Sequence, residues 1–282
     1  MVLDKNQVQV AILDLYEGKA NQGMRCIRTI LHHWALEHNV EIQVTEFEVR
    51  LKNELPDTSF DIYISSGGPG DPLITRYDDW DIAWCKWLDK MVRWNANPSN
   101  DQKKHVFFIC HSFQLASRHF NTGLICKRKS TSFGVFPVHM LDAGKEERIF
   151  EGLLDPFYAV DSRDYQVIQP NHGLLNQMGA KILCIEKSRP HVPYERAMMA
   201  LRFNNYMVGT QFHPEADPVG MSHHFQQEEK KKTVIETHGE DKLRSMLAHL
   251  EDPDKIAWTY AHILPNFLNQ SIEQMSAIMI EG

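Results

Sequence analysis

Residues that together could carry out covalent hydrolysis stand where apolar segments of this sequence end. Cys110 directly follows the apolar run 105–109, and the polar stretch 111–117 after it is typical of a helix. At a strand-to-helix turn the sulfur faces the free N–H groups of the first helical turn. The positive end of the helix dipole there favours the thiolate, which is the form that attacks carbonyl carbons.

A second apolar run, residues 206–212, leads directly into His213, Pro214 and Glu215. Side chains two positions apart on a strand lie on the same side, so His213 and Glu215 can project together. Pro214 ends the strand pairing because it has no N–H to donate. A nucleophile, a base and a carboxylate that orients the base are the three parts of a covalent hydrolase site.

A turn rich in glycine, residues 67–70, follows the apolar run 61–65. Such a turn is an ordinary way to leave a strand. A backbone N–H that no Cβ shields can also approach a reacting carbonyl oxygen. The turn lacks both the Gly-Lys-Ser/Thr ending of a phosphate loop and the glycine spacing of a dinucleotide site.

The elements that would position these residues are predicted by the pattern of apolar segments. Up to Cys110, the runs 8–13, 42–49 and 61–65 alternate with amphipathic helical stretches, which predicts a parallel sheet covered on both faces. Later runs have little helix between them, and they predict that the sheet is completed and a smaller antiparallel one is added. These runs are 133–141, 157–160, 181–186, 197–203 and 206–212.

The predicted fold class is therefore α/β: a three-layer, mostly parallel central sheet of flavodoxin-like type, a small antiparallel sheet and a helical C-terminal extension. We expect one domain over residues 1–221, with residues 222–282 as a helical extension packed on it. The extension holds a charge run at 228–232 and a last helix that Pro265 should end or kink.

Composition narrows the class of protein. A formal net charge of −7 and a pI near 6.1 weigh against nucleic acid as the main partner. Five cysteines without a Cys-x-x-Cys pair favour a reducing compartment, and four of them are expected to be inert core thiols: Cys26, Cys85, Cys126 and Cys184. We expect no signal peptide, no membrane span and a cytoplasmic location. The 15 histidines form no ligand motif, so no metal site is expected.

The three motifs, in this order, resemble the class I (triad) glutamine amidotransferases, most closely the glutaminase domain of GMP synthase type. In that family a Gly-Gly-Pro-Gly-like turn follows the third strand, the nucleophile turn reads Gly-x-Cys-x-Gly-x-Gln, and the last motif is Gln-Phe-His-Pro-Glu. The corresponding segments here are 67–70, 108–114 and 211–215, and the resemblance covers about residues 8–220.

The resemblance implies a catalytic role for each of the three residues. Cys110 would be the nucleophile, His213 the general base and acid, and Glu215 the carboxylate that orients the histidine. The backbone N–H groups of Gly68 and His111 would form the oxyanion hole.

The resemblance also implies a substrate side of the site. Gln114 would help to hold the amino-acid end of the substrate, and Ser162 and Arg163 fall where the family has another substrate-side segment. Two positions depart from the family, because Phe108 and Ser112 stand where it has glycine. Those glycines let helix and strand approach closely at a strained turn, so Phe108 requires a local repacking.

The implied activity is hydrolysis of the glutamine side-chain amide through a γ-glutamyl thioester, with no cofactor. No ATP-binding loop or synthetase domain is recognisable in the 282 residues, so ammonia would pass to a separate synthase chain. A free-standing γ-glutamyl hydrolase or peptidase is the second hypothesis. The third is a catalytically degenerate binding or regulatory module, for which Phe108 is the argument.

Overall fold

The computed structural model describes residues 7–19, 21–221, 235–236, 239–241, 244, 247 and 252–281. Its strands are β1 (Val8–Asp14), β2 (Ile42–Glu48), β3 (Ile62–Ser65), β4 (His105–Ile109), β5 (Leu124–Met140), β6 (Phe157–Ile168), β7 (Lys181–Glu186), β8 (Met198–Asn204) and β9 (Met207–Thr210). Its α-helices are α1 (Gln22–His38), α2 (Val49–Lys52), α3 (Asp79–Ala96), α4 (His111–His119), α5 (Asp142–Lys145), α6 (His172–Met178) and α10 (Trp258–Glu281). Short 3₁₀ or π turns span Thr75–Tyr77, Arg148–Phe150 and Pro253–Ala257.

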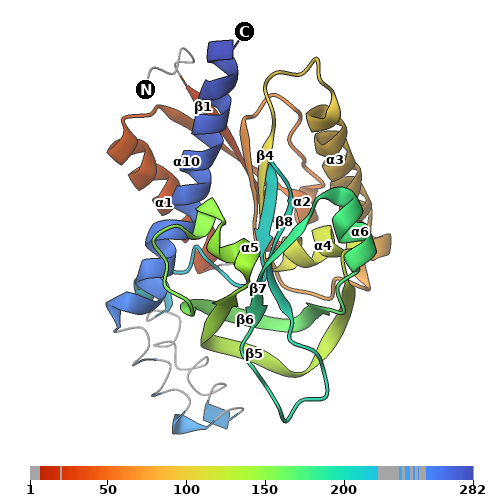
Figure 1. The fold of residues 1–282 in the computed structure, drawn as a ribbon, viewed down its shortest axis with the longest axis vertical. Coiled ribbons are helices and arrows are strands. Elements are labelled where there is room, and N and C mark those ends of the chain that lie inside the picture. Colours follow the sequence, from red (N-terminus) through yellow and green to blue (C-terminus); the bar gives the residue numbers. More distant parts are fainter. Residues whose placement is uncertain are drawn as a thin grey trace.

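The strands form one nine-stranded sheet in the order β2-β1-β3-β4-β9-β8-β7-β5-β6. Figure 1 shows β4 and β8 of this sheet between α10 and α3. The first five strands in this order are parallel, and the others join as antiparallel neighbours. The prediction of a small additional antiparallel sheet is therefore corrected, because these strands extend the parallel sheet. The hairpin between β8 and β9 explains the difference, since it places β8 directly on the free edge of β9 and gives β7 a strand to pair with.

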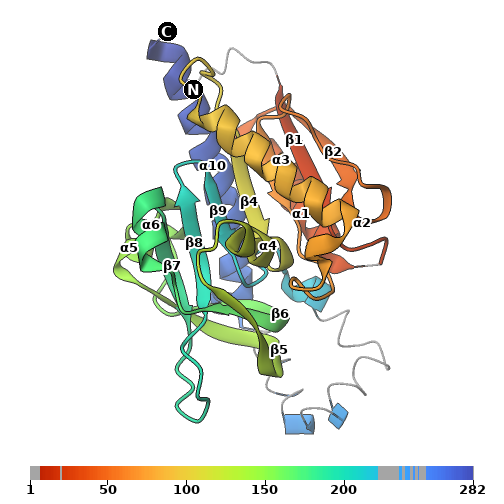
Figure 2. The same cartoon turned by 90° about the vertical axis from the view of Figure 1, so that its right-hand side faces the viewer.

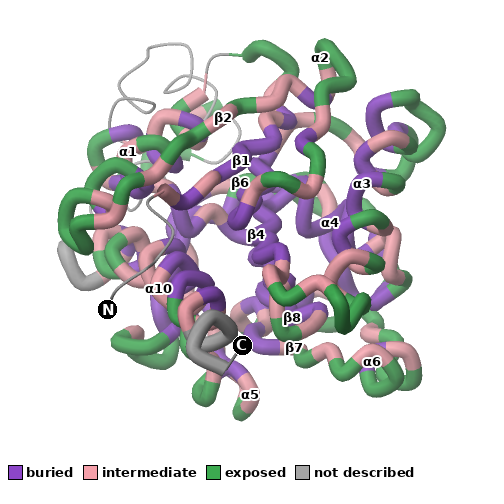
Figure 3. Tube along the Cα trace, turned by 90° about the horizontal axis from the view of Figure 1, so that it is seen from above, coloured by how far each residue is buried: buried purple, intermediate pink, exposed green. Residues whose placement is uncertain are grey.

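Helices cover both faces of the parallel half, as the alternating pattern predicts. α1 and α10 lie on one face, and α3 and α4 lie on the other (Figure 2). Strand β4 has side chains in both cores: Phe107 packs edge-to-face on Phe267 of α10, whereas Phe108 packs on Trp84 of α3. The backbone of β4 is correspondingly buried at the centre of the molecule (Figure 3).

Helix α10 belongs to the same core as α1. Of the two outcomes predicted for Pro265, an end or a kink, the end is wrong, because the helix continues through the proline. The proline removes one backbone hydrogen bond, but apolar residues on both sides of it are buried against the sheet, including Ile263, Phe267 and Ile272. The charge run 228–232 lies outside the described residues. Among the described residues, no helix has both the length and the apolar character that a bilayer span requires.

Candidate active site

The catalytic cysteine predicted from the sequence stands at a strained turn between β4 and α4. Cys110 has φ 48° and ψ −96°, a left-handed conformation that residues with a side chain rarely adopt. Its N–H continues the sheet by donating to the carbonyl of Thr210 at 2.8 Å, and its carbonyl accepts from the N–H of Gln114 in α4 at 3.0 Å. The turn therefore projects the sulfur beyond the carboxyl end of β4, 3.7 Å from the carbonyl oxygen of Ser162.

Ser112, one of the two departures from the family motif, holds this turn together. Its hydroxyl donates to the carbonyl of Ser65 at 2.7 Å and accepts from the N–H of Ile109 at 2.8 Å. The first bond ties α4 to the end of β3, and the second fixes the last residue of β4. A serine here replaces the close backbone approach of a glycine with two buried hydrogen bonds.

Phe108, the other departure, is accommodated by a glycine on the neighbouring strand. Phe108 pairs with Gly209 of β9, is fully buried, and packs edge-to-face on Trp84 and Phe203 at centroid distances of 5.8 and 5.6 Å. It shares this core with Phe113 of α4. A Cβ at Gly209 would lie 2.9 Å from the Cβ of Phe108, so the missing side chain on β9 makes room for the phenylalanine.

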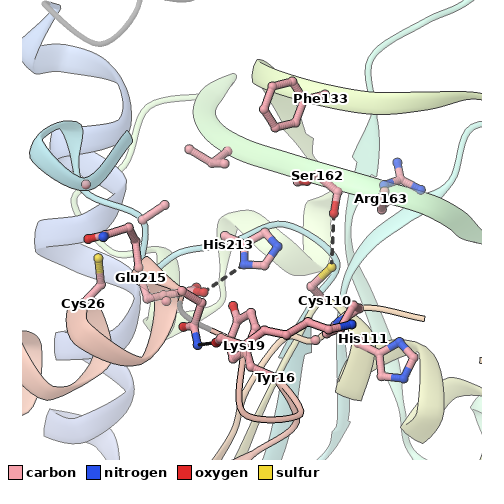
Figure 4. Close-up of a pocket in the computed structure, with 18 of the residues that line it drawn as sticks. Tyr16, Lys19, Cys26, Cys110, His111, Phe133, Ser162, Arg163, His213 and Glu215 are labelled. Carbon is pink, nitrogen blue, oxygen red and sulfur yellow. Dashed lines mark hydrogen bonds and ion pairs between the residues drawn. The ribbon is translucent and has the colours of Figure 1, made fainter. Parts of the chain in front are cut away.

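His213 and Glu215 lie on the same side of the chain and contact each other, as the spacing predicts. The Nδ1 atom of His213 is 2.8 Å from Oε1 of Glu215, whose carboxylate is buried (Figure 4). Burial by itself would lower the pKa of His213. The negative charges of Glu215 and Cys110, with hydrogen bonds to both, outweigh burial and raise this pKa well above its ordinary value.

The carboxylate of Glu215 lies against the first turn of α1, a contact that sequence reasoning missed. A Cβ on Gly23, in that turn, would be 3.2 Å from Oε1 of Glu215 and 2.4 Å from Oη of Tyr16. A side chain at this position would force Tyr16 to move, and the positive end of the helix dipole stabilises the carboxylate. Burial, followed by the negative charges of Glu215 and Cys110, raises the pKa of Tyr16 well above its ordinary value. The position of residues 15–23 in the sequence could have indicated this contact. They follow β1 directly, so they lie at the carboxyl ends of the parallel strands, where the other site residues also lie.

The two predicted oxyanion-hole residues line the same cavity as Cys110. A Cβ at Gly68 would be 2.4 Å from the carbonyl oxygen of Leu15, so the turn requires glycine at this position. His111 is the first residue of α4, so its N–H has no partner within the helix. Its ring is buried near Trp80, and burial, then the positive charges of Arg50 and Arg118, lowers its pKa to about 3. The ring is therefore neutral.

The cavity has a volume of about 500 Å³ and brings together the predicted catalytic residues Cys110, His213 and Glu215. Lys19, which the sequence did not single out, also lines it, and 64% of its side chain is exposed. Gln114 reaches the cavity, where its amide donates to the Tyr165 carbonyl at 3.3 Å and to Gln211 at 3.2 Å.

The other predicted substrate-side residues, Ser162 and Arg163, are placed differently from each other. Ser162 lies over Cys110, to which it presents its carbonyl oxygen. Arg163 points away from Cys110 (Figure 4), and its guanidinium is paired with Asp161 at 2.8 Å and with Glu186 at 3.3 Å. Arg163 also lines the cavity, but its charge is paired with carboxylates inside the protein.

The family model for class I glutamine amidotransferases matches residues 24–232 of this sequence. The match covers more than half of the chain and includes the turn at Cys110 and the pair His213–Glu215, so it establishes the family of this protein. The chain belongs to the class I glutamine amidotransferases and is an enzyme of that family.

Solved structures share the fold at low sequence identity. A glutamine amidotransferase from Thermotoga maritima is 15% identical with a TM-score of 0.64, over 94% of this chain and 98% of that chain. A glutamine amido transferase from Methylobacillus flagellatus is 13% identical with a TM-score of 0.57, over 94% and 95%. The glutaminase domain of a Trypanosoma brucei CTPS with bound acivicin is 13% identical with a TM-score of 0.57, over 94% of both chains. No curated protein sequence matches this chain.

Proposed function

We propose that this chain releases ammonia from the glutamine side chain through Cys110, His213 and Glu215. One observation carries the proposal: Cys110, held at positive φ at the start of α4, lines the same cavity as the hydrogen-bonded pair His213–Glu215. Family membership supports glutamine as the substrate. The closer affinity to the GMP synthase type rests on the sequence motifs and stays a prediction.

The chemistry follows from the protonation state of the histidine. Because the pKa of His213 is raised, the imidazolium is the stable partner of Glu215 and of a negative sulfur. The sulfur of Cys110 attacks the amide carbon, and the N–H groups of Gly68 and His111 stabilise the oxygen that becomes negative. The C–N bond then breaks as His213 donates a proton to the leaving ammonia, which leaves a γ-glutamyl thioester.

The second half of the reaction returns the enzyme to its starting form. Neutral His213 takes a proton from water, whose oxygen attacks the thioester carbon. The C–S bond breaks, glutamate leaves, and the sulfur and the imidazolium are restored. Glu215 keeps the ring oriented in both steps, since its carboxylate is fixed by burial against α1.

The α-carboxylate of glutamine requires a cation, and we assign this role to Lys19. Arg163 is paired with Asp161 and Glu186, whereas the ion pair of Lys19 among the described residues is an exposed one, with Glu17 at 3.4 Å. Ammonia would pass to a separate synthase chain, as the sequence suggests.

A γ-glutamyl hydrolase or peptidase is the second candidate, and the cavity volume favours keeping it. A volume of about 500 Å³ is in the range of pockets for ligands larger than a free amino acid. The accommodation of Phe108 by Gly209 removes the main argument for a degenerate module.

The test is ammonia release from glutamine, beside cleavage of a γ-glutamyl dipeptide, by wild type and Cys110→Ala. Cys126→Ala is the matched control, because Cys126 is a partly exposed thiol that does not line the cavity. We expect wild type and the control to be active on glutamine and Cys110→Ala to be inactive. Activity on the dipeptide alone would favour the peptidase. Equal rates for wild type and Cys110→Ala on both substrates would refute the assignment.

A further inference from the structure

A cluster of buried arginines lies beside the catalytic cavity, around the carboxylates of Asp161 and Glu186. Glu186 is paired with Arg128 at 2.9 Å, with Arg189 at 2.7 Å and with Arg163 at 3.3 Å, and Asp161 is paired with Arg163 at 2.8 Å. The arginine side chains are only 5%, 12% and 1% exposed for Arg128, Arg189 and Arg163. All three charges are therefore largely removed from water.

The charges of this cluster do not balance. Three guanidinium groups share two carboxylates, and the side-chain oxygen of Gln166 accepts from both Arg128 at 3.2 Å and Arg189 at 3.3 Å. A neutral amide oxygen shared by two cations cannot replace an anion, so one positive charge is left over. Burial, and then the like charge of Arg163, lowers the pKa of Arg128, which is the expected effect of an uncompensated cation.

Two of the three arginines, Arg128 and Arg189, line a second cavity of about 290 Å³, whereas Arg163 lines the catalytic cavity. The lining of the second cavity also holds the two carboxylates of the cluster, Asp161 and Glu186. Other polar residues in it include Ser130, Ser132, Lys187 and His191. The ammonium of Lys187 lies 4.4 Å from the centre of the Phe136 ring at the wall of this cavity, which adds a further positive charge. Guanidinium, ammonium and hydroxyl groups are the donors that recognise the oxygens of a phosphate.

We infer that this second cavity is a binding site for a phosphate group, held by Arg128 and Arg189. The bound oxyanion supplies the negative charge that the three arginines lack. Arg128 uses its Nε and one terminal nitrogen in the hydrogen bonds to Ser130, Gln166 and Glu186. No described residue accepts from its other terminal nitrogen, which is available to a ligand. The volume suits a phosphate group, either free or at the end of a larger compound, better than a whole nucleotide.

The second cavity lies next to the catalytic cavity, and residues of β5 and β6 contribute to both. Asp161 and Arg163 of β6 belong to the arginine cluster, while Ser162 between them presents its carbonyl oxygen to Cys110. Thr131 of β5 lines both cavities. A phosphate bound to the cluster would therefore lie directly behind the strand that covers the sulfur.

The experiment is calorimetric titration of the full chain with inorganic phosphate, at constant ionic strength set with chloride. A nucleoside monophosphate and a sugar phosphate are titrated in parallel. We expect saturable one-to-one binding of inorganic phosphate. Tighter binding of a monoester would identify the phosphate of a larger compound as the ligand, and equal or weaker binding would identify the free ion.

Two variants locate the site. Arg189→Met should weaken phosphate binding at least tenfold, because Arg189 is the more exposed of the two cavity arginines and its loss leaves the Arg128–Glu186 pair in place. Arg148→Met, which removes a surface pair with Glu273, should bind as wild type does. Lys19→Met should also bind normally, since Lys19 lines the catalytic cavity.

The outcomes separate this site from the proposed reaction, because binding is measured without glutamine. Absence of saturable binding at about 10 mM phosphate, where a millimolar site would be mostly occupied, overturns the inference. So does a folded Arg189→Met protein with wild-type affinity. If Lys19→Met weakened phosphate binding and Arg189→Met did not, the phosphate would bind in the catalytic cavity. That result would also overturn the inference.

Discussion

Replacing Phe108 tests whether the nucleophile turn tolerates its departure from the family motif. Phe108→Gly removes a fully buried ring that contacts Trp84 and Phe203. Deleting a buried phenylalanine side chain costs about 3–5 kcal/mol of unfolding free energy, and the added backbone freedom of glycine contributes in the same direction. Ammonia release should be intact or raised in the folded fraction. The turn at Cys110 is held by the hydrogen bonds of Ser112, which the substitution leaves in place.

A double-mutant cycle of Phe108→Gly with Gly209→Ala measures how much the contact between these two residues contributes to the free energy of unfolding. In wild type, Gly209→Ala would place a Cβ 2.9 Å from the Cβ of Phe108, and overpacking of this kind costs about 1–3 kcal/mol. In the Phe108→Gly background that contact disappears, although contacts with the Phe108 carbonyl at 3.0 Å and with Phe113 at 3.1 Å remain. The second substitution should therefore cost about 1 kcal/mol less, which is the coupling energy of the pair.

The free energy of unfolding is measured in urea for wild type, the two single variants and the double variant. Ammonia release from glutamine is measured without urea. Phe108→Leu is the fallback if the glycine variant does not fold, since a smaller apolar side chain should cost about 1–3 kcal/mol and keep activity. Additive costs for the two substitutions would refute the contact argument. A folded Phe108→Gly protein without activity would show that the ring itself maintains the turn.

Four further predictions concern the catalytic cavity. Iodoacetamide should label Cys110 before Cys26, because burial raises the pKa of Cys26 to about 12, and peptide mapping decides the order. His213→Ala should abolish ammonia release, whereas Glu215→Gln should keep a measurable residue of it, because the amide still orients the ring. The raised pKa of His213 should stabilise the fold fully below pH of about 6.5, and this contribution should fade as the pH rises through the folded-state pKa. Unfolding free energy against pH should be flatter for His213→Gln. Lys19→Met should raise KM for glutamine with little change in kcat.

Each of these has a contrary result. Labelling of Cys26 first would remove the nucleophile assignment, and negligible effects of both substitutions at His213 and Glu215 would place the pair outside the chemistry. An unchanged pH profile in His213→Gln would mean that the charged pair does not form. A Lys19→Met variant that loses kcat at unchanged KM would exclude a role in holding the carboxylate.

Local patterns in the sequence determined the parallel half of the fold and the turns that end its strands. Apolar runs alternating with amphipathic helices predict a covered parallel sheet, and the edge beyond its carboxyl ends is the place for a site. Cys110 after one run and the pair His213–Glu215 after another are therefore expected to meet. The structure has them in one cavity. These features are readable because strand and helix periodicity and turn residues act over a few positions.

Only the tertiary structure decided how distant segments combine. Pairing of β8 with β9 fixed a single mixed sheet, and burial of α10 carried that helix through Pro265. Because Gly209 lies beside Phe108 on the neighbouring strand, its lack of a side chain makes room for the phenylalanine ring. Arg163 pairs with Glu186 of β7 and so points away from the sulfur of Cys110. Each depends on which atoms meet across many residues of chain, and a sequence pattern carries no information about packing at that separation.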